Sequence, residues 1–286
     1  MPITSAPPLL YYSFMNATKA LLAAKGVAFD EPHGVRAHNM RGTWRKMALS
    51  NEGIRVLQRG IVPALAQSFG ECETTTIHSL EELLFNLPWI HRTYRLTYKS
   101  QQNLFIPLTD CRFLFDAATS AAYFATNLSR DFSGRKFFRR LPATLIPDAA
   151  IGDDRAIRAT AAAPLTIATP SNPADIAALI SLQRAFRPDL NYISGAQTLW
   201  YVKTVVRGPS RLQRSPLTPT LRAMRRLSEI CRGRPIQLAS FLAGQKSWLL
   251  TEFNRQVHKN SGRRCAGPCN SSLRRPVGQF RSSHFG

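Results

Sequence analysis

Apolar residues recur at helical spacing near the start of the chain and again between Leu238 and Phe253. Between Leu9 and Lys25 they include Leu10, Phe14 and Leu21, and Gly26 provides a stop signal. Because only a narrow arc of this segment is polar, we expect its helix to be mostly buried. The same reasoning predicts helices at Leu9–Lys25, Leu80–Phe85, Pro173–Phe186, Pro219–Arg232 and Leu238–Phe253.

Two of these helices begin with a capping signal. Asn172 precedes Pro173, and Thr218 precedes Pro219. Side-chain oxygens of Asn and Thr accept hydrogen bonds from the first helical turn, and proline fits the first helical position. We therefore expect Asn172 and Thr218 to be the N-caps.

Short β-prone runs separated by turn residues occupy the middle of the chain. They predict a small antiparallel sheet, with Pro142–Asp154 as a loop. The predicted strands are Tyr94–Tyr98, Leu104–Leu108, Cys111–Phe115, Ala122–Thr126, Tyr192–Ile193 and Leu199–Val206.

Together these elements predict an α+β protein, mainly α, with one domain over residues 1–254. The N-terminal part, about 1–92, is helical. The middle part, about 93–206, contains the strands, and the C-terminal part, about 207–254, is helical again. No internal repeat is evident in the sequence.

The composition adds a strong positive charge to this picture. The 286 residues are 44% apolar, enough for a substantial core, and they carry 38 Lys plus Arg against 17 Asp plus Glu, a net charge of +21. Such a surface favours polyanions as partners. Nine of the basic residues lie between Lys203 and Arg234, with the single acid Glu229.

Residues 255–286 form a basic low-complexity segment without an acid. We expect a disordered tail, because Arg, Ser, Gly, Cys and Pro cannot build a core. Two origins fit: a basic nucleic-acid-binding arm, or translation of a shifted reading frame. We favour the frame shift slightly, because the composition changes inside a predicted helix and not at a linker.

Five irregularly spaced cysteines argue against a disulfide framework and are typical of a reducing compartment. No apolar run reaches the ~18 residues that a membrane span needs, and the N-terminus lacks the basic region of a signal peptide. We expect a cytoplasmic protein without a membrane partner.

One candidate site lies on the first predicted helix. Tyr12, Asn16 and Lys19 are spaced i, i+4 and i+7, so they share a stripe, and His33 follows in the next loop. The stripe is either a polar spot that binds an anion or a hydrogen-bond network that holds the loop to the helix. We favour the network.

A second candidate site is a set of arginines. A helix would place Arg222, Arg225, Arg226 and Arg232 on one basic face, and Arg234 follows just after it. The set indicates either phosphate binding, with salt-sensitive affinity that does not depend on sequence, or a solvated helix face. Base stacking has little support, because Trp200 and Tyr201 are the only aromatic residues just upstream.

Metal and nucleotide chemistry have little support. Cys265 and Cys269 lack a second ligand pair, and His33 and His38 lack suitable acids nearby. No Walker, dinucleotide-binding or nucleophile-elbow motif occurs. We expect no metal, no other cofactor and no catalytic residues.

Four motifs stand out along the chain: Tyr11-Tyr12-Ser13 with Asn16, Lys19-Ala20 and His33-Gly34; Ser79–Leu84 before Pro88; Asn191–Ser194; and Leu227-Ser228 with Cys231–Pro235. These motifs resemble those of the YaaC-like protein family, and the likeness runs from about Leu10 to Phe253. One departure is Arg232-Gly233, where YaaC-like proteins have Arg-Tyr. The opening motif also resembles the first helix of HEPN-type domains.

The resemblance implies a HEPN-like helical bundle that can pair as a homodimer. Many HEPN domains are RNases with an Arg four to six residues before a His, but Arg36 precedes His38 by two residues and Arg255 precedes His258 by three. We therefore predict a non-catalytic protein that binds nucleic-acid phosphates or a protein partner. The alternative is a divergent, metal-independent RNase in which folding brings a histidine near Arg232 or Arg234.

Overall fold

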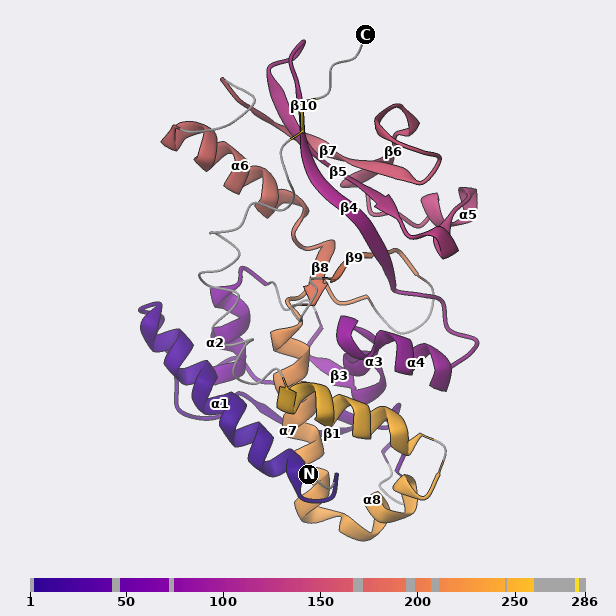
Figure 1. Cartoon of the computed structure of the whole chain (residues 1–286). Coiled ribbons are helices and arrows are strands. Elements are labelled where there is room, and N and C mark those ends of the chain that lie inside the picture. Colours follow the sequence, from indigo (N-terminus) through magenta and orange to yellow (C-terminus); the bar gives the residue numbers. More distant parts are fainter. Residues whose placement is uncertain are drawn as a thin grey trace. The chain divides into compact units, whose positions relative to one another are not determined.

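The computed structural model describes residues 3–42, 47–71, 75–166, 172–193, 199–206, 211–244 and 246–259, and the backbone of 281–282 (Figure 1). The chain divides into two compact units. The first combines Met1–Gln102 with Arg207–Pro268, and the second combines Asn103–Val206 with Cys269–Gly286. The first unit is therefore assembled from segments on either side of residues 103–206.

The first unit is built around two long helices that pack against each other, although almost 200 residues separate them in sequence. Its helices are α1 (Ala6–Ala24), α2 (Ile61–Ser68), α3 (Leu80–Phe85), η1 (Pro88–Ile90), α4 (His91–Thr97), α7 (Leu217–Gly233), α8 (Pro235–Leu242) and a last helix over residues 247–259. Figure 1 shows α7 between α1 and α4.

A three-stranded antiparallel sheet completes the first unit. Its strands are β1 (Val35–Asn39), β2 (Glu52–Val56) and β3 (Ile77–Ser79), in the order β1-β2-β3. Val35 pairs with Val56, and Ile54 pairs with His78. Helix α7 contacts β1 and β2, so this sheet brings polar residues from the first third of the chain to α7.

The second unit contains a curled antiparallel sheet with the strand order β6-β7-β5-β4-β9-β8. The strands are β4 (Phe105–Asp116), β5 (Ala121–Leu128), β6 (Leu145–Pro147), β7 (Ala156–Pro164), β8 (Leu190–Ile193) and β9 (Leu199–Lys203). The two-residue strand β10 (Arg281–Ser282) pairs with β4 in parallel. The helices are η2 (Arg130–Phe132), α5 (Arg135–Phe138), η3 (Ala149–Ile151) and α6 (Pro173–Phe186).

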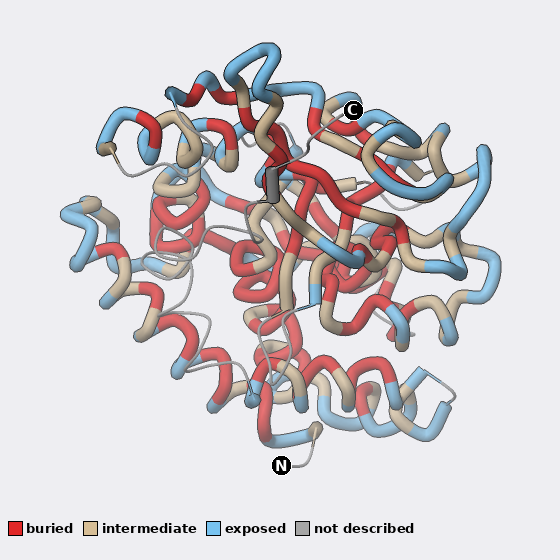
Figure 2. Tube along the Cα trace, turned by 45° about the horizontal axis from the view of Figure 1, so that its top comes forward, coloured by how far each residue is buried: buried red, intermediate tan, exposed pale blue. Residues whose placement is uncertain are grey.

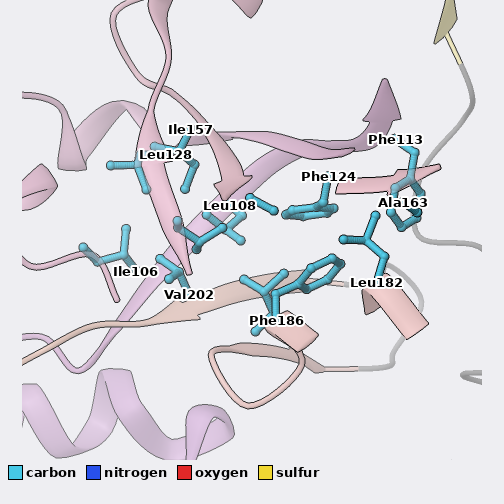
Figure 3. Packing of buried hydrophobic residues seen from close by; sticks show 13 residues of the cluster. Ile106, Leu108, Phe113, Phe124, Leu128, Ile157, Ala163, Leu182, Phe186 and Val202 are labelled. Atoms are coloured by element: carbon cyan, nitrogen blue, oxygen red, sulfur yellow. The ribbon is translucent and has the colours of Figure 1, made fainter. Parts of the chain in front are cut away.

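Helix α6 and the sheet enclose the core of the second unit. Leu182 and Phe186 face Phe113 and Phe124 of the sheet (Figure 3). The rings of Phe124 and Phe186 lie 4.8 Å apart. Burial of this contiguous apolar cluster holds the helix on the sheet.

The expected helical bundle with a small sheet is wrong, because two sheets are present and one of them has six strands along its main path. The sequence pattern did not reveal β1, β2, β3 and β7, nor helix α2. β7 reads Ala-Ile-Arg-Ala-Thr-Ala-Ala-Ala-Pro, and its alanines have little intrinsic strand preference. Pairing with β5 and β6 makes it a strand.

Two strand assignments also differ. Tyr94–Tyr98 does not form a strand, because residues up to Thr97 belong to α4, where Tyr94 is fully buried. Leu104–Leu108 and Cys111–Phe115 are not separate strands but fall on the continuous β4, which is interrupted by a register shift between Thr109 and Arg112. The shift explains why the pattern looked like two strands.

Of the two predicted N-caps, one is confirmed and the other is wrong. The Asn172 cap of α6 is confirmed: the backbone N–H of Asp175 donates to Asn172 Oδ1 at 2.7 Å. Helix α7 begins at Leu217, so Thr218 lies within the helix and is not its cap.

The expected helix Leu238–Phe253 is two helices, α8 and residues 247–259. The second helix continues past residue 254, and Val257 is buried. The predicted loop Pro142–Asp154 contains β6. Most of the basic tail, together with Cys265 and Cys269, lies outside the described residues.

Candidate functional site

Helix α1 separates the two neighbouring tyrosines. Tyr11 has no exposed surface, whereas 41% of Tyr12 is exposed, because adjacent helical positions point about 100° apart. Buried and exposed residues alternate along this helix (Figure 2). Asn16 is exposed and Lys19 is half-buried. The stripe of Tyr12, Asn16 and Lys19 therefore lies on the outer face of α1.

The loop that carries His33 is fixed by backbone hydrogen bonds to Leu57, just after β2, and to the first turn of α2. Ile61 N–H donates to the Pro32 carbonyl at 3.0 Å, and Val62 N–H donates to the His33 carbonyl at 3.2 Å. Leu57 N–H donates to the Gly34 carbonyl at 2.8 Å. These bonds position His33 independently of α1.

Two glycines permit this arrangement. Gly34 has φ +75° and Gly60 has φ +125°, conformations that side chains disfavour. A Cβ on Gly60 would lie 2.5 Å from the Gly34 Cα. A Cβ on Gly34 would lie 2.4 Å from Pro63 Cδ, so both its positive φ and this contact favour glycine in the His33-Gly34 motif.

The side chain of His33 contacts α1 through Tyr11 and Met15. A hydrogen bond of 2.8 Å joins Tyr11 Oη to His33 Nδ1, and Met15 Sδ lies 2.9 Å from the same nitrogen. Lys19 forms an ion pair with Glu31 of the loop. A network between helix and loop is therefore present, but Tyr11 replaces Tyr12 as the partner of His33.

Helix α7 places two arginines against the tyrosine pair. Arg225 Cζ lies 5.6 Å from the centroid of the Tyr11 ring, and Arg232 Cζ lies 6.0 Å from the centroid of the Tyr12 ring. Their spacing of seven residues puts both on the side of α7 that faces α1. Arg225 also forms an ion pair of 2.8 Å with Glu229.

The other predicted arginines do not share this surface. Arg226 and Arg234 form ion pairs of 2.5 and 2.6 Å with Glu52, a carboxylate of β2 without exposed surface. Arg222 is fully buried, so its guanidinium does not reach the surface. Burial raises the pKa of Glu71, and hydrogen bonds, Arg214 and Arg222 partly offset this effect. The five arginines therefore do not form one basic face.

Burial lowers the pKa of His33 below its ordinary value, and the positive charge of Arg225 lowers it further. Glu229 acts in the opposite direction, while Lys19 and Arg232 add to the lowering. The imidazole is therefore neutral near pH 7. This is consistent with Tyr11 O–H as the donor to Nδ1, since burial raises the pKa of Tyr11.

Arg232 is the most available cation of this group. It is exposed, its Nε donates to the Ser228 carbonyl at 3.3 Å, and its guanidinium lies over the Tyr12 ring. Within the described residues, no carboxylate forms an ion pair with it. Tyr12, Lys19, His33, Arg225 and Arg232 together are called the α1–α7 surface below.

The α1–α7 surface combines the cations Lys19, Arg225 and Arg232 with the ring of Tyr12 and a neutral imidazole, and its cations suit it to binding an anion. Sequence reasoning named all five of its members but placed Tyr12 and Arg232 in separate sites. The sequence contains no local signal that joins residues 220 positions apart.

Two kinds of feature are absent from the described part of the chain. No three His, Cys, Asp or Glu side chains converge there as metal ligands. None of the helices described is both long enough and apolar enough to cross a membrane.

Comparison with known proteins gives one match. The family model described as YaaC-like Protein matches residues 1–261. No curated protein matches the chain, and no solved structure does. A relationship to HEPN domains stays a prediction.

Proposed function

The chain belongs to the YaaC-like protein family, and we propose that it is a cytoplasmic, non-catalytic protein that binds nucleic-acid phosphates on the α1–α7 surface. The main support for this proposal is the position of Arg232. Its guanidinium is exposed and lies over the Tyr12 ring, and no carboxylate of the described residues forms an ion pair with it. Such a guanidinium offers a phosphate several N–H donors. The net charge of +21 attracts polyanions to the molecule.

Lys19 and Arg225 support Arg232 in different ways. The carboxylate partner of Lys19, Glu31, is 77% exposed, and an exposed ion pair is worth little free energy. A phosphate can therefore replace Glu31 at modest cost. Arg225 keeps Glu229 as its partner and contributes mainly by facing His33.

The alternative function is cleavage of RNA without a metal ion. One observation favours it: His33 is neutral near pH 7 and is close enough to Arg225 and Arg232 for both charges to lower its pKa. A neutral imidazole can accept a proton while a neighbouring cation holds the phosphate. The Tyr12 ring contacts both groups, with its centroid 6.5 Å from the His33 ring centroid and 6.0 Å from Arg232 Cζ, and the divergent RNase hypothesis requires a histidine near Arg232 or Arg234.

Binding of a fluorescein-labelled 20-nucleotide RNA, measured between 50 and 300 mM salt, tests the proposal. We expect affinity to fall steeply with salt, and Arg232→Gln to flatten the slope by about one unit. Arg92→Gln is the matched control, because Arg92 is exposed and Figure 1 shows α4 on the other side of α7 from α1. This variant should keep the full slope.

Three outcomes would contradict the proposal. Equal slopes for both variants would remove phosphate binding from the α1–α7 surface. No binding at 50 mM salt would remove nucleic acid as the partner and leave a protein partner or a homodimer. Metal-independent cleavage of the RNA on a denaturing gel, lost in His33→Gln, would replace the non-catalytic function by the RNase alternative.

A further inference from the structure

Tyr12 carries an aromatic ring that the fold leaves partly open to solvent. It is 41% exposed, and Leu9, one turn earlier on α1, is 63% exposed. Large apolar side chains that lie together on a surface often mark a binding site. The two residues add an apolar strip to the cationic α1–α7 surface.

The ring of Tyr12 is held in position before any ligand binds. Its edge-to-face contacts are with Tyr11, at 5.5 Å and 61°, and with His33, at 6.5 Å and 64°. Tyr11 is buried, and the His33 loop is fixed by backbone hydrogen bonds. Arg232 lies over the Tyr12 ring. A ring that is already oriented loses little entropy when a ligand stacks against it.

The Tyr12 ring and the Arg232 guanidinium together favour single-stranded over double-stranded nucleic acid. A duplex keeps its bases stacked on one another and offers the protein mainly phosphates and groove edges. An unpaired base has a free face, which stacks on an aromatic ring or on a guanidinium plane. A surface that bound only duplex phosphates would gain nothing from an exposed ring.

We propose that the α1–α7 surface binds single-stranded nucleic acid, with one unpaired base stacked on the Tyr12–Arg232 pair and the neighbouring phosphates bound by Arg232 and Lys19. This inference rests on the proposed function and adds its substrate class. Lys19 is seven residues along α1 from Tyr12, about 10 Å at the helical rise. The strand therefore runs along the outer face of α1.

The test compares labelled single-stranded U20 RNA with a 20-base-pair A·U duplex at one salt concentration. The wild-type protein should bind the single strand at least about tenfold more tightly. Tyr12→Leu should weaken single-strand binding about five- to 150-fold, since stacking one base is worth about 1–3 kcal/mol. Its duplex affinity should not change, and Tyr12→Phe should behave like the wild type.

The variants separate this inference from the proposed function. Arg232→Gln should weaken binding of both RNAs. If Tyr12→Leu, with an unchanged melting temperature, binds the single strand as well as the wild type does, single-strand selection is overturned and phosphate binding stands. Equal losses for both RNAs in Tyr12→Leu also overturn it. Absence of binding to either RNA at 50 mM salt overturns both proposals.

Discussion

At the scale of single residues, burial decides which charged groups are structural. Glu52 has no exposed surface and is bonded to Arg226 and Arg234. Removing one member of a buried pair leaves a charge that neither water nor a partner stabilises. Arg232, by contrast, is exposed and can meet a ligand. The arginines of α7 and its C-terminal end thus have different roles, although they are close together in the sequence.

His33 gives the α1–α7 surface a pH dependence. Its pKa is lowered, so the free protein carries a neutral imidazole near pH 7. A bound phosphate favours the imidazolium and raises this pKa, so the complex takes up a proton as pH falls. RNA affinity should therefore rise between pH 8 and pH 6, measured by anisotropy at constant salt.

His33→Gln is the control, and the added gain on acidification should disappear in it. In the absence of RNA, the lowered pKa of His33 makes the folded protein less stable in acid. The unfolded chain binds the proton more readily, so His33 costs the folded state stability as pH falls below about 6.5. An affinity that falls on acidification in the wild type alone would contradict the assignment.

At the scale of elements, close contacts between backbones place the functional loop. The connections before β1 and before α2 meet at Gly34 and Gly60. The helix and strand patterns of the sequence do not predict this contact. The His33-Gly34 motif of the YaaC-like resemblance is explained by it, because Gly34 has positive φ and a Cβ at this position would meet Pro63.

Gly60→Ala should therefore disturb both stability and binding. The new Cβ would lie 2.5 Å from the Gly34 Cα and 2.6 Å from the Pro32 carbonyl oxygen, at φ +125°. We expect about 1–3 kcal/mol of destabilisation in urea unfolding, with weaker RNA binding because the His33 loop moves.

Gly26→Ala is the matched control for backbone strain. Gly26 has φ +66°, and a Cβ added to it would meet no atom within 4 Å. Gly26→Ala should therefore lower the free energy of unfolding only through the unfavourable backbone conformation of alanine, by about 1 kcal/mol. If both variants unfold at the same urea concentration, the Gly34–Gly60 approach is not restrictive.

At the scale of the whole molecule, each unit has its own core. The cluster around Phe124 and Phe186 belongs to the second unit, whereas Tyr11, Leu227 and Phe253 are buried in the first. The core of the first unit includes residues from its C-terminal segment. The helix over residues 247–259 supplies the buried side chains of Phe253 and Val257.

Truncation locates the end of the first unit. A chain that stops after Lys259 keeps Val257, which is 1% exposed, and of the described contacts it loses only the short β10 pairing. It should melt close to the full chain. A chain that stops after Asn254 loses Val257 and should be less stable by about 1.5–3 kcal/mol.

Equal melting of the two truncated chains would show that the last helical turn contributes nothing. The origin of the basic tail is a separate question, which the coding DNA answers. A frame shift requires that an alternative frame past this point continues an apolar, helical pattern.

The sequence by itself determined what depends on neighbours within a few residues and on composition. The α6 cap at Asn172, the helical pattern of α1 and the excess of positive charge are all of this kind. Each follows from local hydrogen bonding, local periodicity or counting, so no distant partner is needed.

Only the tertiary structure decided which polar residues meet. A buried arginine needs a carboxylate wherever the chain provides one, and Glu52 of β2 meets Arg226 of α7 across 174 positions. Tyr12 and Arg232 meet because α1 packs on α7. Desolvation and packing act across space and leave no trace in local sequence. The α1–α7 surface is therefore a product of the fold.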